Sequence, residues 1–217
     1  MNIRNELVNI VRSECKANGV NLYLGSGKSV QYNRSVRVNG FFDFDTKIPK
    51  LACATGRPNW ELVLVHELNH MLQWKEDCKV WRNYCATTGN MIERAISGKS
   101  TDSNKLKKDS MITLLMEHDC ERRSHAMLKK LGYPKTKLTE YVQKANAYSL
   151  FYLYVAKHKK WYSIGKEPYN LKIVWSKFPK TFDIDIFSTF NNLGHLFEYC
   201  VKPIPSKQRS YFRLTFD

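Results

Sequence analysis

Apolar residues recur at helical spacing over residues 2–18, where they form a single stripe. The stripe consists of Ile3, Leu7, Ile10, Val11 and Cys15. The pair Asn18-Gly19 that follows is typical of the end of a helix. This pattern predicts a helix that packs on a neighbouring element through one face.

Residues 20–56 show the alternation of strands, in short runs broken by turn residues. The run from Val20 to Leu24 alternates apolar and polar positions, and the run from Leu51 to Ala54 is continuously apolar, as in a buried strand. Asn39-Gly40 is a strong turn signal. We therefore expect a small, mostly antiparallel sheet in this region.

A helix is predicted next, over residues 58–75. Asn59 is in position to cap it, and the run from Trp60 to Val65 is apolar nearly all round. A helix that is apolar on every side lies inside a protein, so ionisable residues further along it need buried partners.

A longer helix is predicted from Met111 to Leu131. Asp109-Ser110 offers an N-cap, and Gly132 offers a C-terminal stop. The polar stretch from Ser100 to Lys108 before it is predicted to be a mobile loop. One face of the helix carries Leu114, Glu117, Glu121, Ser124, Leu128 and Leu131. Two carboxylates on such a face require a metal ion or hydrogen-bonding partners.

A third helix, rich in tyrosine, is predicted up to about residue 157, and residues 158–217 mix aromatic and basic residues. These elements predict an α+β fold in a single domain, with the small N-terminal sheet packed on the buried helix and a largely helical C-terminal part. The expected parts are an N-terminal helix and sheet (1–57), the buried helix (58–75), a helical part (109–157) and a C-terminal extension (158–217).

Composition narrows the class of protein. The chain of 217 residues is 43% hydrophobic, as expected of a globular protein. It contains no apolar run of the roughly 18 residues that a membrane helix needs, and no apolar segment typical of a signal peptide follows Met1. Six cysteines without C-x-x-C spacing are expected to be free thiols. We therefore expect a cytoplasmic protein that does not insert into membranes.

The net charge of +15 would attract polyanions such as nucleic acid. The basic residues concentrate in the second half of the chain, at Lys105 to Lys108, Arg122-Arg123, Lys129-Lys130, Lys157 to Lys160 and Lys202 to Arg213. A solubilising surface would have the same composition, so charge leaves both interpretations open.

The buried helix contains the motif H-E-x-x-H, at His66-Glu67-Leu68-Asn69-His70. Imidazoles four residues apart on a helix point from the same face and can share a zinc ion. Glu67, next to the first histidine, can accept the proton of a water molecule on that ion. The motif predicts a zinc site that is completed by a third ligand from elsewhere in the chain.

The two helices together resemble the gluzincin branch of the zincin metallopeptidases, in which a second helix supplies a glutamate ligand within E-x-x-[AS]-D. Glu117-His118-Asp119-Cys120-Glu121 resembles that pattern, with Cys120 at the small position and Glu121 in place of aspartate. The whole sequence also resembles small uncharacterised zincin-like proteins of bacteriophages. The resemblance implies Glu117 as third ligand, with Glu121 either in that role or bonded to a ligand histidine. His118, Cys120 and His125 are fallback ligands.

The resulting hypothesis is a zinc-dependent metallopeptidase that acts on a protein or peptide through His66, His70, Glu117 and the general base Glu67. The resemblance also implies a tyrosine or histidine that stabilises the oxyanion. The possible residues for this role are Tyr148, Tyr152, His158 and His195. The alternative is a basic nucleic-acid-associated protein with a structural or vestigial zinc site, in which aromatic residues such as Trp161-Tyr162 accompany the lysines.

Overall fold

The computed structural model describes residues 3–33, 37–87, 91–162 and 167–198. Cys200 and the basic stretch from Lys202 to Arg213 lie outside the described residues. The described chain divides into two compact units, the first formed by residues up to Cys78 together with Arg123–Pro134, and the second by the rest. The single domain expected from the sequence stays a prediction.

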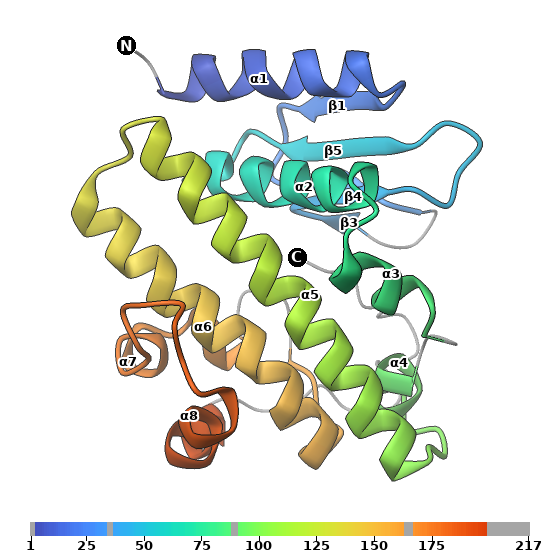
Figure 1. Cartoon of the computed structure of the whole chain (residues 1–217), viewed down its shortest axis with the longest axis vertical. Coiled ribbons are helices and arrows are strands. Elements are labelled where there is room, and N and C mark those ends of the chain that lie inside the picture. Colours follow the sequence, from blue (N-terminus) through green and yellow to red (C-terminus); the bar gives the residue numbers. More distant parts are fainter. Residues whose placement is uncertain (1–2, 34–36, 88–90, 163–166, 199–217) are drawn as a thin grey trace. The chain divides into compact units, whose positions relative to one another are not determined.

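The first unit contains a small sheet and two helices that contact each other, and the fold is α+β as predicted (Figure 1). Its elements are α1 (Ile3–Ala17), β1 (Asn21–Gly25), β2 (Val30–Gln31), β3 (Arg37–Val38), β4 (Gly40–Asp43), β5 (Lys50–Ala54) and α2 (Trp60–Lys75). The three-stranded sheet has the order β1-β5-β4, and β2 and β3 form a separate antiparallel pair. Since β1 is parallel to β5 and β4 is antiparallel to it, the larger sheet is mixed.

The centre of the first unit lies where α2 packs against β4 and β5. The strand from Leu51 to Ala54 is completely buried, as its continuous apolar run predicts. Asn39 and Gly40 do not form a hairpin turn. Asn39 instead forms a bend between β3 and β4, and these strands pair with different partners. The chain therefore changes sheets at the residue before β4, which is an edge strand of the larger sheet.

The prediction of a mobile loop over residues 100–108 is wrong, as is that of an N-cap at Asp109-Ser110. Helix α5 covers Ser103–Lys130 and begins six residues before Asp109. Asp102 caps it, because its Oδ1 accepts hydrogen bonds from the backbone N–H groups of Asn104 and Lys105, both at 2.9 Å. Leu106 is buried within this first part of the helix, so the polar stretch has an apolar anchor.

The C-terminal end of α5 follows the prediction. Gly132 adopts a positive φ of 76°, and its N–H bonds to the carbonyl oxygen of Lys129. A residue with a side chain rarely adopts this left-handed conformation, so glycine is favoured there. The N–H of Tyr133 returns to the carbonyl oxygen of Leu128, which completes the C-cap.

The second unit is helical and is built around α6 (Lys135–His158). Its other elements are α3 (Lys79–Cys85), α4 (Met91–Ile96), the first part of α5, η1 (Pro168–Asn170), α7 (Lys172–Trp175), α8 (Ile186–Leu193) and η2 (Gly194–Glu198). Aromatic residues form much of its core. Phe151 lies at the centre of this group and contacts the rings of Tyr154, Trp161, Tyr162, Tyr169 and Phe197.

Burial of Trp161 and Tyr162 changes the interpretation of the basic segment beside them. Both side chains are buried, and the Tyr162 hydroxyl is within hydrogen-bonding distance (3.0 Å) of the hydroxyl of Tyr154. These rings are part of the core and are not presented for stacking on nucleic-acid bases.

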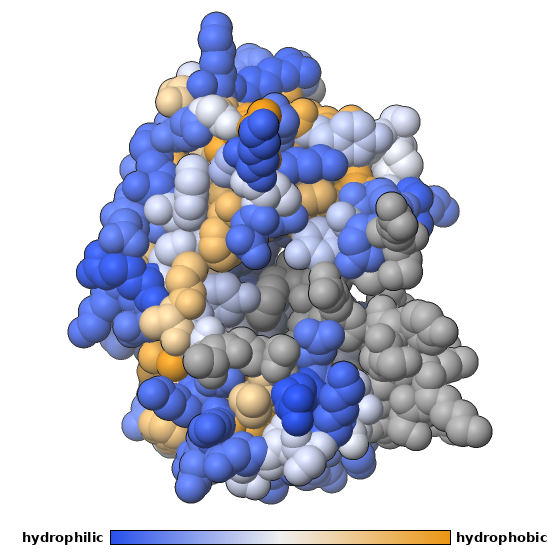
Figure 2. All heavy atoms as spheres, turned by 90° about the vertical axis from the view of Figure 1, so that its right-hand side faces the viewer, coloured by the Kyte–Doolittle hydropathy of each residue, from blue (hydrophilic) through white to orange (hydrophobic). Residues whose placement is uncertain are grey.

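Hydrophilic residues cover most of the face shown in Figure 2, with hydrophobic residues scattered between them. In the described part of the chain, no helix combines the length and the apolar character required to cross a bilayer. The few large apolar side chains that are strongly exposed include Tyr23 and Ile48 in the first unit and Ile173 and Phe187 in the second.

Candidate metal centre

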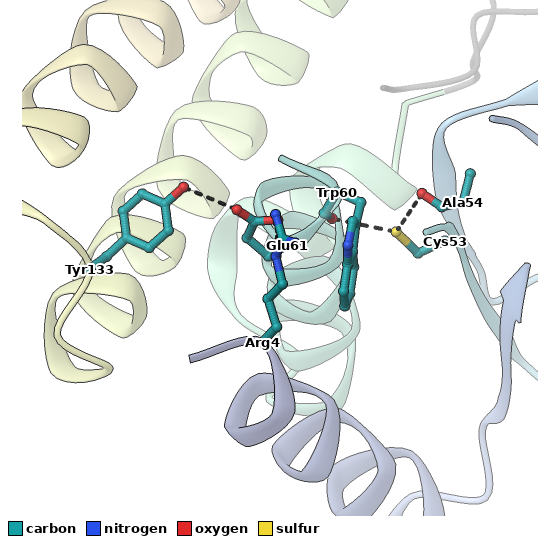
Figure 3. Close-up of polar contacts among 6 residues, drawn as sticks. All are labelled: Arg4, Cys53, Ala54, Trp60, Glu61 and Tyr133. Atoms are coloured by element: carbon teal, nitrogen blue, oxygen red, sulfur yellow. Dashed lines mark hydrogen bonds and ion pairs between the residues drawn. The ribbon is translucent and has the colours of Figure 1, made fainter. Parts of the chain in front are cut away.

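A buried carboxylate fixes the start of α2 within the first unit. Glu61, in the first turn, is only 5% exposed, and it accepts hydrogen bonds from Arg4 Nε and from the Tyr133 hydroxyl, both at 3.2 Å (Figure 3). The Arg4 guanidinium also lies over the Trp60 ring. These contacts tie three chain segments together and set the orientation of the helix that carries the H-E-x-x-H motif.

The two motif histidines lie side by side on α2. Nε2 of His66 is 3.0 Å from Nε2 of His70, and the two rings are nearly perpendicular, at 88°. Both side chains are buried, with 5% of each exposed. The spacing of four residues therefore brings the two ring nitrogens together, as the motif predicts.

Gln73 determines which nitrogen of His70 carries the proton. Its Oε1 lies 3.0 Å from Nδ1 of His70, and Gln73 is completely buried. An amide oxygen only accepts hydrogen bonds, so Nδ1 of His70 donates and carries the proton. The lone pair of the neutral ring is then on Nε2, which faces His66.

This arrangement fits a metal ion. Two nitrogens that each lie about 2.0–2.1 Å from a tetrahedral zinc ion are about 3.3 Å apart, close to the observed 3.0 Å. A histidine ligand usually donates its other N–H to an acceptor, and Gln73 provides that acceptor for His70. The donor set that the first unit supplies is thus two imidazole nitrogens, one of them with its tautomer fixed.

Glu67 lies on the side of α2 that faces the sheet. Its side chain is 1% exposed, and its Cγ approaches the α-carbon of Gly40, the first residue of β4, so closely that a Cβ there would lie 3.0 Å from it. The same Cβ would lie 2.6 Å from Val63. Gly40 therefore permits a close approach of strand and helix beside the expected catalytic carboxylate.

Cys53, on β5, is close enough to Glu67 for the charge of the carboxylate to affect its pKa. Burial raises the pKa of Cys53 to about 12, and the negative charge of Glu67 contributes to the increase. The Cys53 thiol, which is within 3.6 Å of the Trp60 carbonyl oxygen, stays protonated and neutral near neutral pH (Figure 3). It packs in the core of the first unit.

The last part of α5 belongs to the first unit and contacts α2 there. Asn69 Nδ2 donates a hydrogen bond to Ser124 Oγ at 3.1 Å, and it also donates to the carbonyl oxygen of Val65 at 2.8 Å. Asn69 lies one residue before His70 on α2. The fourth position of the motif therefore contacts α5 through Ser124.

Ser124 defines one face of α5. Residues three, four and seven positions earlier share this face, because the helix is continuous over Ser103–Lys130. These positions are Glu121, Cys120 and Glu117. They belong to the second unit, where Cys120 and Glu117 are completely buried and Glu121 is 8% exposed. The sequence prediction of two carboxylates on a buried face agrees with this burial.

Within the second unit, Glu117 lies in the electrostatic vicinity of a tyrosine pair on α6. The hydroxyls of Tyr148 and Tyr152 are 3.1 Å apart, and both side chains are buried. Burial, followed by the negative charge of Glu117, raises the pKa of each tyrosine well above its ordinary value. Both hydroxyls therefore stay protonated near neutral pH.

Glu121 has a defined partner in the second unit. The hydroxyl of Tyr141, on α6, donates a hydrogen bond to Oε2 of Glu121, and both side chains are buried. One oxygen of Glu121 is therefore engaged by α6. Asp119 points elsewhere, since its Oδ1 accepts from Arg122 at 3.0 Å.

The remaining histidines of the sequence analysis lie in different surroundings. His118 packs edge-on against Phe182 within the second unit, and burial lowers its pKa. His158 stacks on Tyr154 and lies 3.6 Å from the Glu198 carboxylate, which is near the end of the described chain. His195 is exposed.

Three residues of these surroundings were not identified from the sequence: Gln73, Tyr141 and Gly40. Gln73 could have been found, because it lies three residues after His70 on a helix already predicted to be buried. Tyr141 gave no local signal, since its partner Glu121 is 20 residues away in the sequence. Gly40 belongs to the Asn39-Gly40 turn signal, which gives no indication of a close approach to Glu67.

Comparison with protein-family models, with curated proteins and with solved structures finds no match for this chain. A functional hypothesis therefore depends on the chemistry of its own residues.

Proposed function

We propose that this protein is a zinc-dependent metallopeptidase. The observation that carries the proposal is the pair of buried imidazoles, with Nε2 atoms 3.0 Å apart and with His70 held by Gln73 in the tautomer that a metal ligand needs. Without a shared cation or proton, two such lone pairs would repel each other in a buried site.

The proposed third ligand is Glu117, on the face of α5 that carries Ser124. Ser124 contacts Asn69 of the motif helix, and Glu117 lies two helical turns away along the same face. Glu121 is the weaker choice, because Tyr141 engages its carboxylate. Cys120 is the second alternative; a thiolate would be more usual in a closed structural site.

A zinc ion bound to these residues would lower the pKa of a water molecule and polarise a substrate carbonyl. Glu67 then accepts a proton from the attacking water and later delivers it to the leaving amine. The motif helix holds Glu67 beside β4, and burial excludes bulk water from the carboxylate. Tyr148 and Tyr152 remain proposals for stabilising the oxyanion; their raised pKa values keep both as donors.

The substrate that this arrangement suits is an extended peptide. β4 is an edge strand of the three-stranded sheet, and it starts next to Glu67. Backbone groups on an edge strand can pair with an added strand, which would bring a peptide bond alongside the carboxylate.

Metal analysis tests the proposal directly. Protein purified without chelators is expected to contain about one zinc per chain. The double variant His66→Ala/His70→Ala should contain none, whereas the matched variant His195→Ala, which removes an exposed histidine, should retain it. A folded wild-type protein that neither contains zinc nor takes it up would refute the proposal.

The third ligand is identified by three further variants. Glu117→Gln is expected to lower zinc affinity by a factor of 100 or more, on the order expected for loss of a charged ligand. Glu121→Gln should have a smaller effect, and Cys120→Ala should have none. Loss of zinc from Cys120→Ala with retention in Glu117→Gln would assign the ligand to Cys120 instead.

Catalysis is tested separately from metal binding. Glu67→Gln is expected to keep its zinc and to lose cleavage of a mixed peptide library, because the amide cannot accept the proton of water. Undiminished cleavage by this variant would exclude Glu67 as the base.

The alternative of nucleic-acid binding now rests on the +15 charge, since Trp161 and Tyr162 belong to the core. Titration with DNA and RNA over a range of salt concentrations tests it. Negligible binding at low salt would remove this alternative.

A further inference from the structure

A cavity lies within the second unit, between the end of α3 and the first turns of α5. Its volume is about 440 Å³, within the range of roughly 300–1,000 Å³ typical of small-molecule sites. The side chains that line it are Asn83, Ala86, Thr87, Lys105, Lys108, Asp109 and Ile112. None of them takes part in the proposed metal site.

Four of the lining residues form one stripe of α5, and the other three are Asn83 of α3 and the two residues Ala86 and Thr87 that follow this helix. Lys105, Lys108, Asp109 and Ile112 are spaced i, i+3, i+4 and i+7 on α5. Three of these four positions are charged. Lys105 and Lys108 are exposed to solvent at the rim of the cavity, whereas Asp109 and Ile112 are partly buried.

The charged groups differ in their surroundings. In the part of the chain that the structure describes, neither Lys105 nor Lys108 forms a salt bridge. Burial raises the pKa of Asp109. The positive charge of Lys108 and a hydrogen bond from the backbone N–H of Met91 partly offset this increase. The cavity therefore offers two ammonium groups and one carboxylate, an excess of positive charge.

The opposite wall is neutral and polar. The hydroxyl of Thr87 donates to the carbonyl oxygen of Tyr84 at 2.7 Å, which leaves its oxygen as an acceptor towards other groups. The amide of Asn83 both donates and accepts. Ile112 and Ala86 add apolar surface.

We propose that this cavity binds a small organic phosphate of the size and chemistry of a nucleoside monophosphate. The ammonium groups of Lys105 and Lys108 would bind the phosphate. Asp109 accepts hydrogen bonds from ligand hydroxyls or amines, Asn83 recognises a polar edge, and Ile112 contacts the apolar face of the ligand. The proposal is independent of zinc and of peptidase activity.

Isothermal titration of the purified full-length protein with AMP tests this site. Adenosine and inorganic phosphate serve as separate probes of the two halves of the ligand. We expect saturable binding of one AMP per chain, binding of phosphate weaker by about tenfold or more, and no measurable binding of adenosine alone. Absence of AMP binding at millimolar concentration would overturn the proposal.

Charge-matched variants separate the cavity from the general positive charge. Lys105→Ala/Lys108→Ala is expected to weaken AMP binding by at least about tenfold. Lys99→Ala/Lys107→Ala removes the same charge from exposed positions outside the cavity and should change binding by less than about twofold. Equal weakening by both pairs would show long-range attraction and would refute the site.

Two further measurements complete the test. Thermal unfolding of all variants should match the wild type, because the lysines are exposed and alanine favours helices. A DNA oligonucleotide without a terminal phosphate should not compete with AMP. Competition that depends on Lys105 and Lys108 would reassign the site to the nucleic-acid backbone and would overturn the assignment to a small phosphate.

Discussion

Replacing Gln73 isolates the contribution of a single hydrogen bond to the proposed zinc site. Gln73→Met preserves most of the side-chain volume at a completely buried position but removes the oxygen that lies 3.0 Å from Nδ1 of His70. The proton of His70 is then free to move to Nε2, the nitrogen that must bind the metal. Loss of a residue that hydrogen-bonds a metal ligand lowers metal affinity by about 10–100-fold, which corresponds to about 1.4–2.7 kcal/mol.

Competition with a chromophoric chelator measures this affinity. Gln73→Met should bind zinc more weakly by that factor, and Gln73→Glu should bind at least as tightly as the wild type, because a carboxylate accepts the same hydrogen bond. Gln143→Met is the matched control, since Gln143 is a buried glutamine that donates to backbone carbonyls elsewhere. It should lower stability and leave zinc affinity unchanged. Wild-type affinity in folded Gln73→Met would refute the role of Gln73.

Three other predictions concern stability and reactivity. Tyr133→Phe removes a hydrogen bond to the buried carboxylate of Glu61, so we expect the free energy of unfolding in urea to fall by about 1–2 kcal/mol. The backbone hydrogen bonds at the start of α5 lower the pKa of Asp102. The ionised carboxylate therefore stabilises the fold above the ordinary aspartate pKa, and this stabilisation is lost as the pH falls through the lowered pKa. In thermal melts at acid pH, Asp102→Ala should lack this part of the pH dependence of stability. Iodoacetamide should label the exposed Cys85 rapidly and should leave Cys53 unmodified until the protein unfolds, because burial raises the pKa of Cys53 to about 12. Mass spectrometry of the native protein measures both modifications, and labelling of Cys53 before Cys85 would contradict this reasoning.

The parts of the fold that could be predicted from the sequence are those with strong local signals. The stripe in α1, the apolar run before the motif and the stop at Gly132 each depend on residues close in the chain. The pairing of β1 with β5 could not be predicted, since 24 residues separate these strands and nothing local specifies a parallel arrangement.

The start of α5 was missed for a physical reason. A polar stretch favours a loop, but an exposed helix face is equally polar, and the buried Leu106 anchors this segment. The sequence does not single out Asp102 as the cap, because Asp109-Ser110 offers the same chemistry closer to the apolar run. The early start of α5 matters, because both lysines that line the cavity, Lys105 and Lys108, lie in it.

In the candidate site, too, contacts between residues close in the sequence could be predicted, and contacts between separate helices could not. The pairing of His66 with His70 follows from helical spacing alone, so the sequence could predict it. The engagement of Glu121 by Tyr141 joins two helices and was invisible in the sequence. Glu117 stays the proposed third ligand, and the variants described above decide among Glu117, Glu121 and Cys120.

Because Gly40 approaches Glu67 closely, the residue at this position affects where the carboxylate of the proposed base lies. The Cβ of an alanine there would lie 2.6 Å from Val63 and 3.0 Å from both Glu67 and the backbone carbonyl oxygen of Ala52 on β5. Relief of these contacts would displace the carboxylate of Glu67 and would also strain the pairing of β4 with β5. Substitutions at a strand residue that has no side chain of its own could therefore tune proton transfer while every residue of the H-E-x-x-H motif stays in place.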